Sequence, residues 1–229
     1  NFDQLGCRFN QIVISDDGSK QEHLDSLRQI QSISPIKVVE AIQNGGLGAN
    51  INKGQAACKS PYTLYVQEDF VPLPAFPEKL KTAISFMQSD RELDMVRFYA
   101  YTRYPQLKNH GQGFSTMVFD SNLFSLNYMK FYLYSDHPHL RRSDFASKFG
   151  QYALGLNPEK TEYEMMMSFL KNKGKALFYD DYQSLFEQKN TSSEPSTMKR
   201  NNIRRSENWL IARVRDLYRI LKFNIDYRR

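Results

Sequence analysis

The stretch Ile12-Val13-Ile14-Ser15-Asp16-Asp17-Gly18-Ser19 decides how this chain is expected to fold. Its short run of β-branched residues predicts a buried strand over 11–15, and the acidic and small residues that follow predict a turn. Gly18 permits a positive φ in that turn. Because open α/β sheets bind ligands just beyond the carboxyl ends of their strands, this turn also predicts a ligand crevice.

Two further polar signatures follow, each after its own apolar run. The second comprises Asn44, Gly46, Asn52 and Gly54 and comes after a strand predicted over 36–40. The third is Gln67-Glu68-Asp69, at the end of a strand predicted over 62–67. We expect these strand ends to lie side by side, which would bring the four carboxylates of the first and third signatures to one crevice.

Predicted helices alternate with these strands. They cover 21–33, 48–58, 77–88, 162–173 and 206–222. The alternation favours an α/β fold with a mostly parallel central sheet flanked by helices, followed by a C-terminal helical tail. We expect one domain over 1–187, a polar linker over 188–202 and a basic amphipathic helix within 203–229.

The order of the three signatures resembles the nucleotide-sugar domain of GT-A glycosyltransferases, most closely the inverting family 2. The resemblance covers roughly residues 10 to 180 and implies a GT-A-like sheet. Members of that family open with a further strand and helix, and the strand lies in the middle of the sheet. We therefore expect residues upstream of this sequence to supply that strand, because a sheet without it would leave buried backbone groups unpaired.

The resemblance assigns the nucleotide site to the first two signatures and the start of the third. The expected ligands of the nucleotide are Asp16, Asp17, Ser19, Asn44, Gly46, Asn52 and Glu68. The alternative is that Asp16, Asp17 and Ser19 only stabilise a turn and a helix N-terminus, where Asp and Ser are also favoured. A dinucleotide loop is disfavoured, since the chain lacks the G-x-G-x-x-G pattern.

In the family, the last Asp of a D-x-D motif holds Mg²⁺ or Mn²⁺ beside the diphosphate. Asp69 matches that position, and carboxylate oxygens suit such hard cations. Gln67 stands where the family has the first Asp, which puts the strength of metal binding in doubt. A non-catalytic protein that binds nucleotide sugars is therefore the alternative to an enzyme.

Glu162 and Glu164 are the expected general bases, at the place where family members carry an acidic pair. Residues two apart do not share a helix face, so only one of them is expected to face the cleft. Counting back from Gly174 favours Glu162. The alternative is that both acids simply favour a first helical turn whose N-cap is Thr161.

A second cluster contains His137, His139 and Arg141. The two histidines are separated by one proline, which is not a convincing metal-binding pattern. Binding of an acceptor or of the diphosphate is one reading, since Arg suits phosphate. A solvated loop is the other.

Charge is concentrated near the C-terminus. The chain has a net charge of +6, and residues 199–229 carry ten Lys or Arg and three Asp or Glu, so the remaining residues carry a net charge of −1. With Trp209 and an apolar stripe, this segment is expected either to lie on an anionic membrane or to dock on a protein. Nucleic-acid binding is not expected. No apolar run approaches the ~20 residues of a membrane span.

These observations predict an inverting transferase that moves a hexose from a nucleoside-diphosphate sugar, UDP-linked by preference, to a glycan or lipid-linked glycan. Family membership suggests assembly of bacterial surface polysaccharide. Cys7 and Cys58 form no metal or disulfide pattern, which favours a cytoplasmic setting, with the inner face of the plasma membrane as a site for the C-terminal segment.

Overall fold

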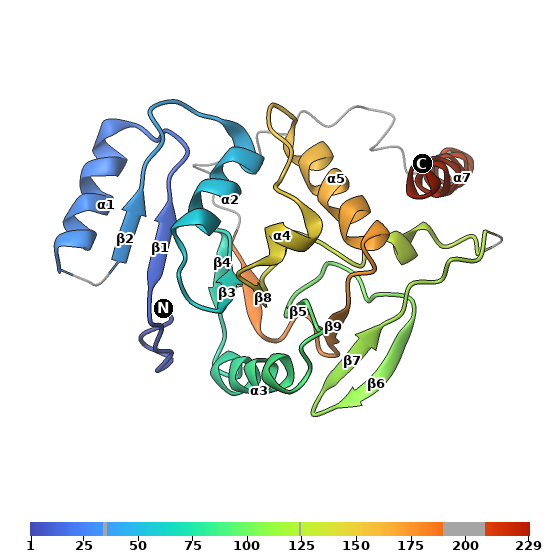
Figure 1. Cartoon of the computed structure of the whole chain (residues 1–229), viewed down its shortest axis with the longest axis horizontal. Coiled ribbons are helices and arrows are strands. Elements are labelled where there is room, and N and C mark those ends of the chain that lie inside the picture. The colour runs from blue at the N-terminus through green and yellow to red at the C-terminus, as the bar shows by residue number, and fades with distance from the viewer. Residues whose placement is uncertain (34–35, 124, 190–208) are drawn as a thin grey trace.

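The computed structural model describes residues 1–33, 36–123, 125–189 and 209–229. Most of the expected linker, residues 190–202, and the start of the expected C-terminal segment, residues 203–208, lie outside the described residues. The first strands and the last helix lie at opposite ends of the molecule (Figure 1).

Helices and strands alternate over the first 65 residues, as expected, and less regularly after them. The helices are α1 (Gln21–Ile33), α2 (Gly46–Ala57), α3 (Phe76–Ser89), α4 (Phe145–Phe149), α5 (Pro158–Lys171) and α7 (Trp209–Arg228), with a 3₁₀ turn η1 (Tyr128–Phe131). The strands are β1 (Ile12–Ser15), β2 (Ile36–Val39), β3 (Tyr62–Tyr65), β4 (Phe70–Pro72), β5 (Met95–Arg97), β6 (Leu107–Gly111), β7 (Phe114–Met117), β8 (His139–Arg142), β9 (Ala176–Tyr179) and β10 (Phe186–Gln188).

The central sheet has six strands in the order β3-β8-β5-β9-β7-β6. β5 and β9 pair in parallel, whereas β8 pairs antiparallel with both β3 and β5. Helices lie above and below the sheet (Figure 1). The expected α/β fold with a central sheet flanked by helices and a C-terminal helix is thus confirmed. The sheet was expected to be mostly parallel and is mixed, with β5 and β9 as the parallel pair in its described part.

β1 and β2 form a separate parallel pair. In the described chain no ladder joins β1 to β3, so the expectation that the three motif-bearing strand ends lie side by side in one sheet is wrong. Figure 1 shows β1, β2 and α1 together at one end of the molecule.

The two faces of the central sheet each bury an apolar cluster, because neighbouring residues of a strand point to opposite faces. Met95 packs with residues of α4 and α5, whereas Val96 packs with α3. β9 alternates in the same way, and all four of its residues are buried. The core therefore holds α5 and its side chains in a fixed position over the sheet.

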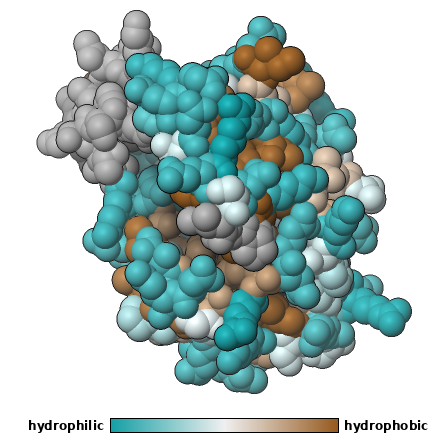
Figure 2. Space-filling model, turned by 90° about the vertical axis from the view of Figure 1, so that its left-hand side faces the viewer, coloured by the Kyte–Doolittle hydropathy of each residue, from teal (hydrophilic) through white to brown (hydrophobic). Residues whose placement is uncertain are grey.

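The outer layer formed by α1 and β2 is less buried. Leu24 is buried, but Ile30, expected on the same inward face, is 42% exposed. The face of the molecule that α1 and β2 form is predominantly hydrophilic (Figure 2).

α7 packs through one face on η1 and α5. Ile220 and Phe223 are buried, and Phe223 contacts the rings of Phe131 and Tyr163. The Tyr163 hydroxyl donates to Asp226 Oδ2 at 2.5 Å. Among the helices that the structure describes, none is long and apolar enough to cross a bilayer.

Candidate active site

Asp16 builds the turn that follows β1. Its Oδ1 accepts hydrogen bonds from the N–H groups of Gly18 and Ser19, both at 3.0 Å. Burial acts to raise the pKa of Asp16, but the hydrogen bonds from the Ser19 hydroxyl and from these N–H groups hold it below its ordinary value. Asp16 is therefore a carboxylate at neutral pH, and its Oδ1 accepts hydrogen bonds from backbone N–H groups of the same turn.

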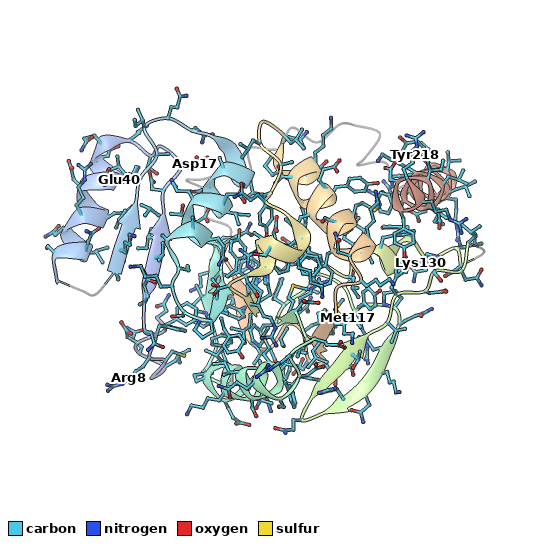
Figure 3. The ribbon with its side chains drawn as sticks, in the orientation of Figure 1. Arg8, Asp17, Glu40, Met117, Lys130 and Tyr218 are labelled. Atoms are coloured by element: carbon cyan, nitrogen blue, oxygen red, sulfur yellow. The ribbon has the colours of Figure 1, made fainter. Side chains whose placement is uncertain are left out.

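Asp17 connects this turn to the start of α2. Its two oxygens accept the N–H groups of Gly45 and Gly46, each at 2.9 Å, and Asn44 Oδ1 accepts from Gly46 at 3.1 Å. Negative charge at a helix N-terminus is favourable because the first N–H groups lack partners within the helix. Asp17 lies in the loops above β1 and α2, as labelled in Figure 3.

Residues of the second signature that lie within α2 pack this helix against neighbouring segments. Asn52 Nδ2 donates to the Tyr152 carbonyl and Asn52 Oδ1 accepts from the Tyr152 N–H, both at 2.9 Å. A Cβ on Gly54 would lie 3.0 Å from that of Ser15, and one on Gly48 would lie 2.3 Å from the Ala153 carbonyl oxygen. The structure thus gives Asn52 and Gly54 roles in packing α2.

The third signature ends between β3 and β4. Asp69 Oδ2 accepts from Gln188 Nε2 at 2.6 Å, while its Oδ1 is buried and has no partner in the described part of the chain. Glu68 is exposed. A buried carboxylate oxygen without a donor is unfavourable, and a cation would relieve it. Nowhere in the described chain do three or more His, Cys, Asp or Glu side chains gather as a metal site, so Asp69 would need oxygens from a ligand to hold one.

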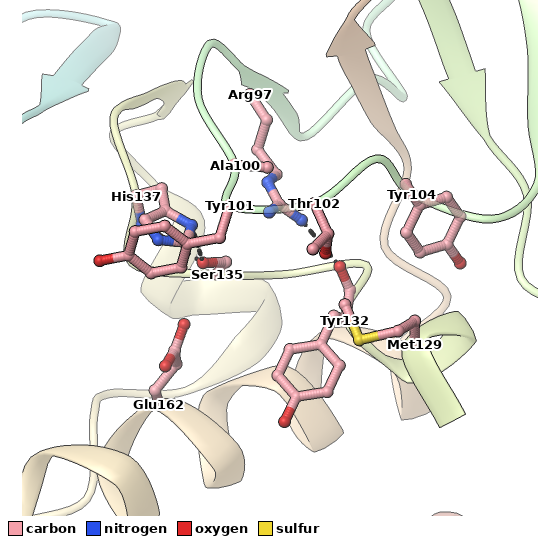
Figure 4. Close-up of a pocket in the computed structure, with 10 residues that line it drawn as sticks. All are labelled: Arg97, Ala100, Tyr101, Thr102, Tyr104, Met129, Tyr132, Ser135, His137 and Glu162. Carbon is pink, nitrogen blue, oxygen red and sulfur yellow. Dashed lines mark hydrogen bonds between the residues drawn. The ribbon is translucent and has the colours of Figure 1, made fainter. Parts of the chain in front are cut away.

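A pocket of about 220 Å³ lies between the end of β5, the segment after η1 and the start of α5 (Figure 4). Its walls are aromatic, with two charged side chains. It is lined by Arg97, Ala100, Tyr101, Thr102, Tyr104, Met129, Tyr132, Ser135, His137 and Glu162.

Glu162 reaches this pocket from the first turns of α5, and its Oε1 accepts the Asp136 N–H at 3.1 Å. Glu164 is exposed and does not line the pocket. The helix begins at Pro158 with Asn157 as its N-cap, and Asn157 Oδ1 accepts from the Lys160 N–H at 2.9 Å. Thr161 is not the N-cap, so that alternative is wrong. A start one turn earlier places Glu162 on the face above the sheet.

Asp136 is a buried acid that the sequence did not single out. It accepts the Tyr134 hydroxyl at 2.6 Å, and its Oδ2 has no partner among the described residues. Burial first, and then the nearby Glu162 charge, raise the pKa of Asp136 to about 7. The Ser-Asp-His-Pro sequence around it resembles an ordinary loop, and nothing in its pattern signals burial.

The expected acceptor cluster is divided by the fold. His137 lines the pocket, and its Nδ1 lies 2.7 Å from Ser135 Oγ. His139 and Arg141 belong to β8, are buried and do not line the pocket. Arg141 donates to Gln55 Oε1 and to the Tyr152 hydroxyl, the latter at 2.7 Å. Arg141 therefore has a structural role, and the solvated-loop reading is wrong for this strand.

Glu162 and the strand-end acids do not share one cavity. The pocket around Glu162 is not lined by Asp17 or Asp69. Asp69 is nonetheless close enough for its charge to act on Tyr99, whose ring lies 5.5 Å from that of His137. Asp69 thus lies beside the pocket, whereas Asp17 belongs to the separate β1–β2 unit.

Comparison with known proteins defines the class. The family model described as glycosyl transferase family 2 matches residues 3–149. The chain belongs to this family. No curated protein matches it.

Solved structures show the same fold. The crystal structure of residues 1–349 of TarS from S. aureus with UDP-GlcNAc matches with a TM-score of 0.54 and 14% identity, over 80% of this chain and 50% of that chain. The UDP complex of the same fragment matches with a TM-score of 0.54 and 15% identity, over 94% and 55%. This chain thus spans about half the length of the TarS fragment.

Proposed function

We propose that this chain transfers a hexose from a nucleoside-diphosphate sugar to a hydroxyl of a glycan or lipid-linked glycan, with inversion at the anomeric carbon. Glu162 carries the proposal. It is an acid fixed by a backbone N–H in an aromatic pocket, within a family 2 glycosyltransferase fold. A carboxylate in that position can take the proton of an acceptor hydroxyl as the hydroxyl attacks.

The donor is proposed to be UDP-linked, which the TarS complexes with UDP-GlcNAc and UDP support. Asp16 and Asp17 would place the nucleotide at the loop that they build. Asp69, with Glu68 beside it, would hold Mg²⁺ or Mn²⁺. A divalent ion bound there would stabilise negative charge on the departing diphosphate. The unpartnered Oδ1 of Asp69 is the feature of this chain that fits a cation.

Asp69→Asn tests the donor and metal sites together. We expect UDP to bind the wild-type chain at least tenfold more tightly with Mn²⁺ than without it, and the variant to lose this difference, because the amide removes the negative charge. Isothermal titration with UDP measures both affinities. Glu78→Gln, at an exposed acid of α3 outside the site, is the control. Failure of UDP to bind the wild-type chain under either condition would contradict the proposed function.

A non-catalytic nucleotide-sugar-binding protein is the second candidate. Gln67 in place of an acid favours it, as does the contact that occupies Asp69 Oδ2 with Gln188. Hydrolysis of the donor separates the two candidates. Equal background rates for wild type, Asp69→Asn and Glu162→Gln would favour the binding protein.

We also propose that α7 attaches the enzyme to the anionic inner face of a bacterial plasma membrane. The outward face of the helix is apolar, with side chains 38–68% exposed. These are Ile211, Val214, Leu217, Tyr218, Leu221 and Ile225. Arg213, Arg219 and Lys222 flank the stripe, and basic amphipathic helices bind anionic lipid surfaces. Tyr218 is labelled on α7 in Figure 3.

Flotation with lipid vesicles tests this attachment. We expect the whole chain to float with vesicles rich in phosphatidylglycerol and to remain unbound with phosphatidylcholine alone. The double substitution Val214→Glu and Leu221→Glu should abolish flotation, since it places charge on the apolar stripe. Leu126→Glu, at an exposed leucine outside α7, is the control. Unchanged flotation of the double variant would exclude α7 as the attachment site.

A further inference from the structure

Arg97 is a buried cation at the end of β5, and one of its guanidinium nitrogens has no hydrogen-bond partner among the described residues. The residue is 4% exposed, yet it lines the pocket that holds Glu162. Nη1 donates to the Tyr132 carbonyl at 2.8 Å, while Nε has no partner among the described residues. Figure 4 shows the guanidinium pointing between Ala100, Thr102 and Tyr132.

Arg141, a similarly buried arginine on the neighbouring strand β8, has partners for its Nε and for both terminal nitrogens. Its Nε and Nη2 both donate to Gln55 Oε1, and its Nη1 donates to the Tyr152 hydroxyl. Arg141 does not line the pocket. A buried charge is expensive unless it is paired, so the free donor of Arg97 and its open pocket point to an anion supplied by a ligand.

The charges around the pocket agree with this reading. Burial lowers the pKa of Arg97 to about 10, so it still carries a proton at neutral pH. Burial lowers the pKa of His137 to about 3, so that ring is neutral. Arg97 and Glu162 are then the charged side chains of the lining, and they do not form a salt bridge with each other within the described chain.

We infer that the pocket binds an acidic sugar, with its carboxylate or phosphate on Arg97 and a hydroxyl near Glu162. The inference rests on the proposed function and names the chemistry of its acceptor. Guanidinium groups bind carboxylate and phosphate with paired hydrogen bonds, which neutral sugars cannot supply. An acceptor held at Arg97 would also be fixed in orientation relative to the base.

The location favours the acceptor over the donor diphosphate as the source of the anion. The pocket contains none of the residues of the strand-end signatures. Its volume of about 220 Å³ is also below the range of about 300–1,000 Å³ that drug-sized ligands occupy. A single sugar unit therefore suits it better than a whole nucleotide sugar.

Titration of the full chain by ligand-observed NMR tests the inference, with D-glucuronate, D-glucose 6-phosphate, neutral D-glucose and UDP as probes. We expect at least one acidic sugar to bind tenfold or more tightly than glucose, with or without saturating UDP. Arg97→Gln should remove this preference and leave UDP affinity unchanged. Arg142→Lys is the control, because Arg142 donates to the main-chain carbonyls of Leu93, Met87 and Asp90 and does not line the pocket.

Thr102→Asp keeps the test decisive if Arg97→Gln does not fold. Thr102 is exposed at the pocket wall, so an added carboxylate there should not disturb the core. It should lower the affinity for acidic sugars at least tenfold through charge repulsion. Equal binding of glucose and both acidic sugars would overturn the inference. Displacement of the acidic sugars by UDP would also overturn it, since the anion site would then belong to the donor. If the wild-type chain does not bind UDP, the proposed function is contradicted. The affinities for acidic and neutral sugars can still be compared in that case.

Discussion

Glu162→Gln is expected to lower kcat for sugar transfer by about 10²–10⁴-fold, the range that a positioned general base contributes. The amide keeps the size of the side chain and can still accept the Asp136 N–H through its oxygen, but it cannot take a proton. UDP affinity should stay within about twofold of wild type, because Glu162 does not belong to the strand-end signatures. Transfer rates with the donor at saturation and titration with UDP measure the two quantities.

Glu164→Gln is the matched control, since this acid stands two residues further along the same helix and is exposed. We expect it to retain wild-type kcat. A full loss of activity in Glu164→Gln with normal activity in Glu162→Gln would reverse the assignment of the base. Equal activity in both variants would remove α5 as the source of the base.

The sequence predicted the elements whose patterns are regular. α1 has the expected bounds, because apolar periodicity and flanking turn residues agree there. α5 begins at Pro158, before the expected start at Glu162, because proline is favourable at the first helical position and Asn157 caps the helix. The choice of acid did not depend on that start, since Glu162, favoured by its distance from Gly174, lines the pocket.

The strands β4, β6, β8 and β10 were not predicted, and β8 and β4 show the physical reasons. β8 reads His-Leu-Arg-Arg, which has no apolar alternation, yet Arg141 is buried through its contacts with Gln55 and Tyr152. Those partners are distant in sequence and cannot be read from the local pattern. β4 ends at Pro72, and proline cannot donate a hydrogen bond to a neighbouring strand. A proline is tolerated at the edge of a small sheet, and here β4 pairs only with β10 in the described chain.

The candidate site was predicted in part. Glu162 and His137 reach one pocket, but Arg97 and Asp136 were not singled out. Both are charged residues next to apolar or loop-like sequence, and their importance arises from burial. Burial depends on which strands become neighbours, and the antiparallel insertion of β8 between β3 and β5 was not expected.

Asp136→Asn should change how stability depends on pH. The pKa of Asp136 is raised to about 7 in the folded protein, while an unfolded Asp has a pKa near 4. Between these values the folded state holds a proton that the unfolded state has lost, so the contribution of Asp136 to stability is fully present below about pH 4 and is lost as pH rises through about 7. One pKa unit corresponds to about 1.4 kcal/mol. Asp136 should therefore lower the free energy of unfolding by about 3 kcal/mol between pH 5 and pH 8.

Urea unfolding of wild type and Asp136→Asn at pH 5 and pH 8 measures this difference. Asn cannot ionise, so the variant should gain about 3 kcal/mol relative to wild type on going from pH 5 to pH 8. The buried His137 and His139 have lowered pKa values and oppose stability in acid, but they do so equally in both proteins and cancel in the comparison. Asp144→Asn, at an exposed Asp before α4, should show no such gain.

The same experiment on Glu162→Gln connects this buried acid to the catalytic proposal. Burial is the larger cause of the raised pKa of Asp136, and the charge of Glu162 is the next. Removing that charge should lower the pKa of Asp136 and shrink the pH dependence of stability without abolishing it. If Glu162→Gln leaves the pH dependence unchanged, the two acids do not interact, and Asp136 would then hold Glu162 only through its N–H group. If it shrinks, the negative charge of Glu162 opposes the ionisation of Asp136, and the two acids interact directly.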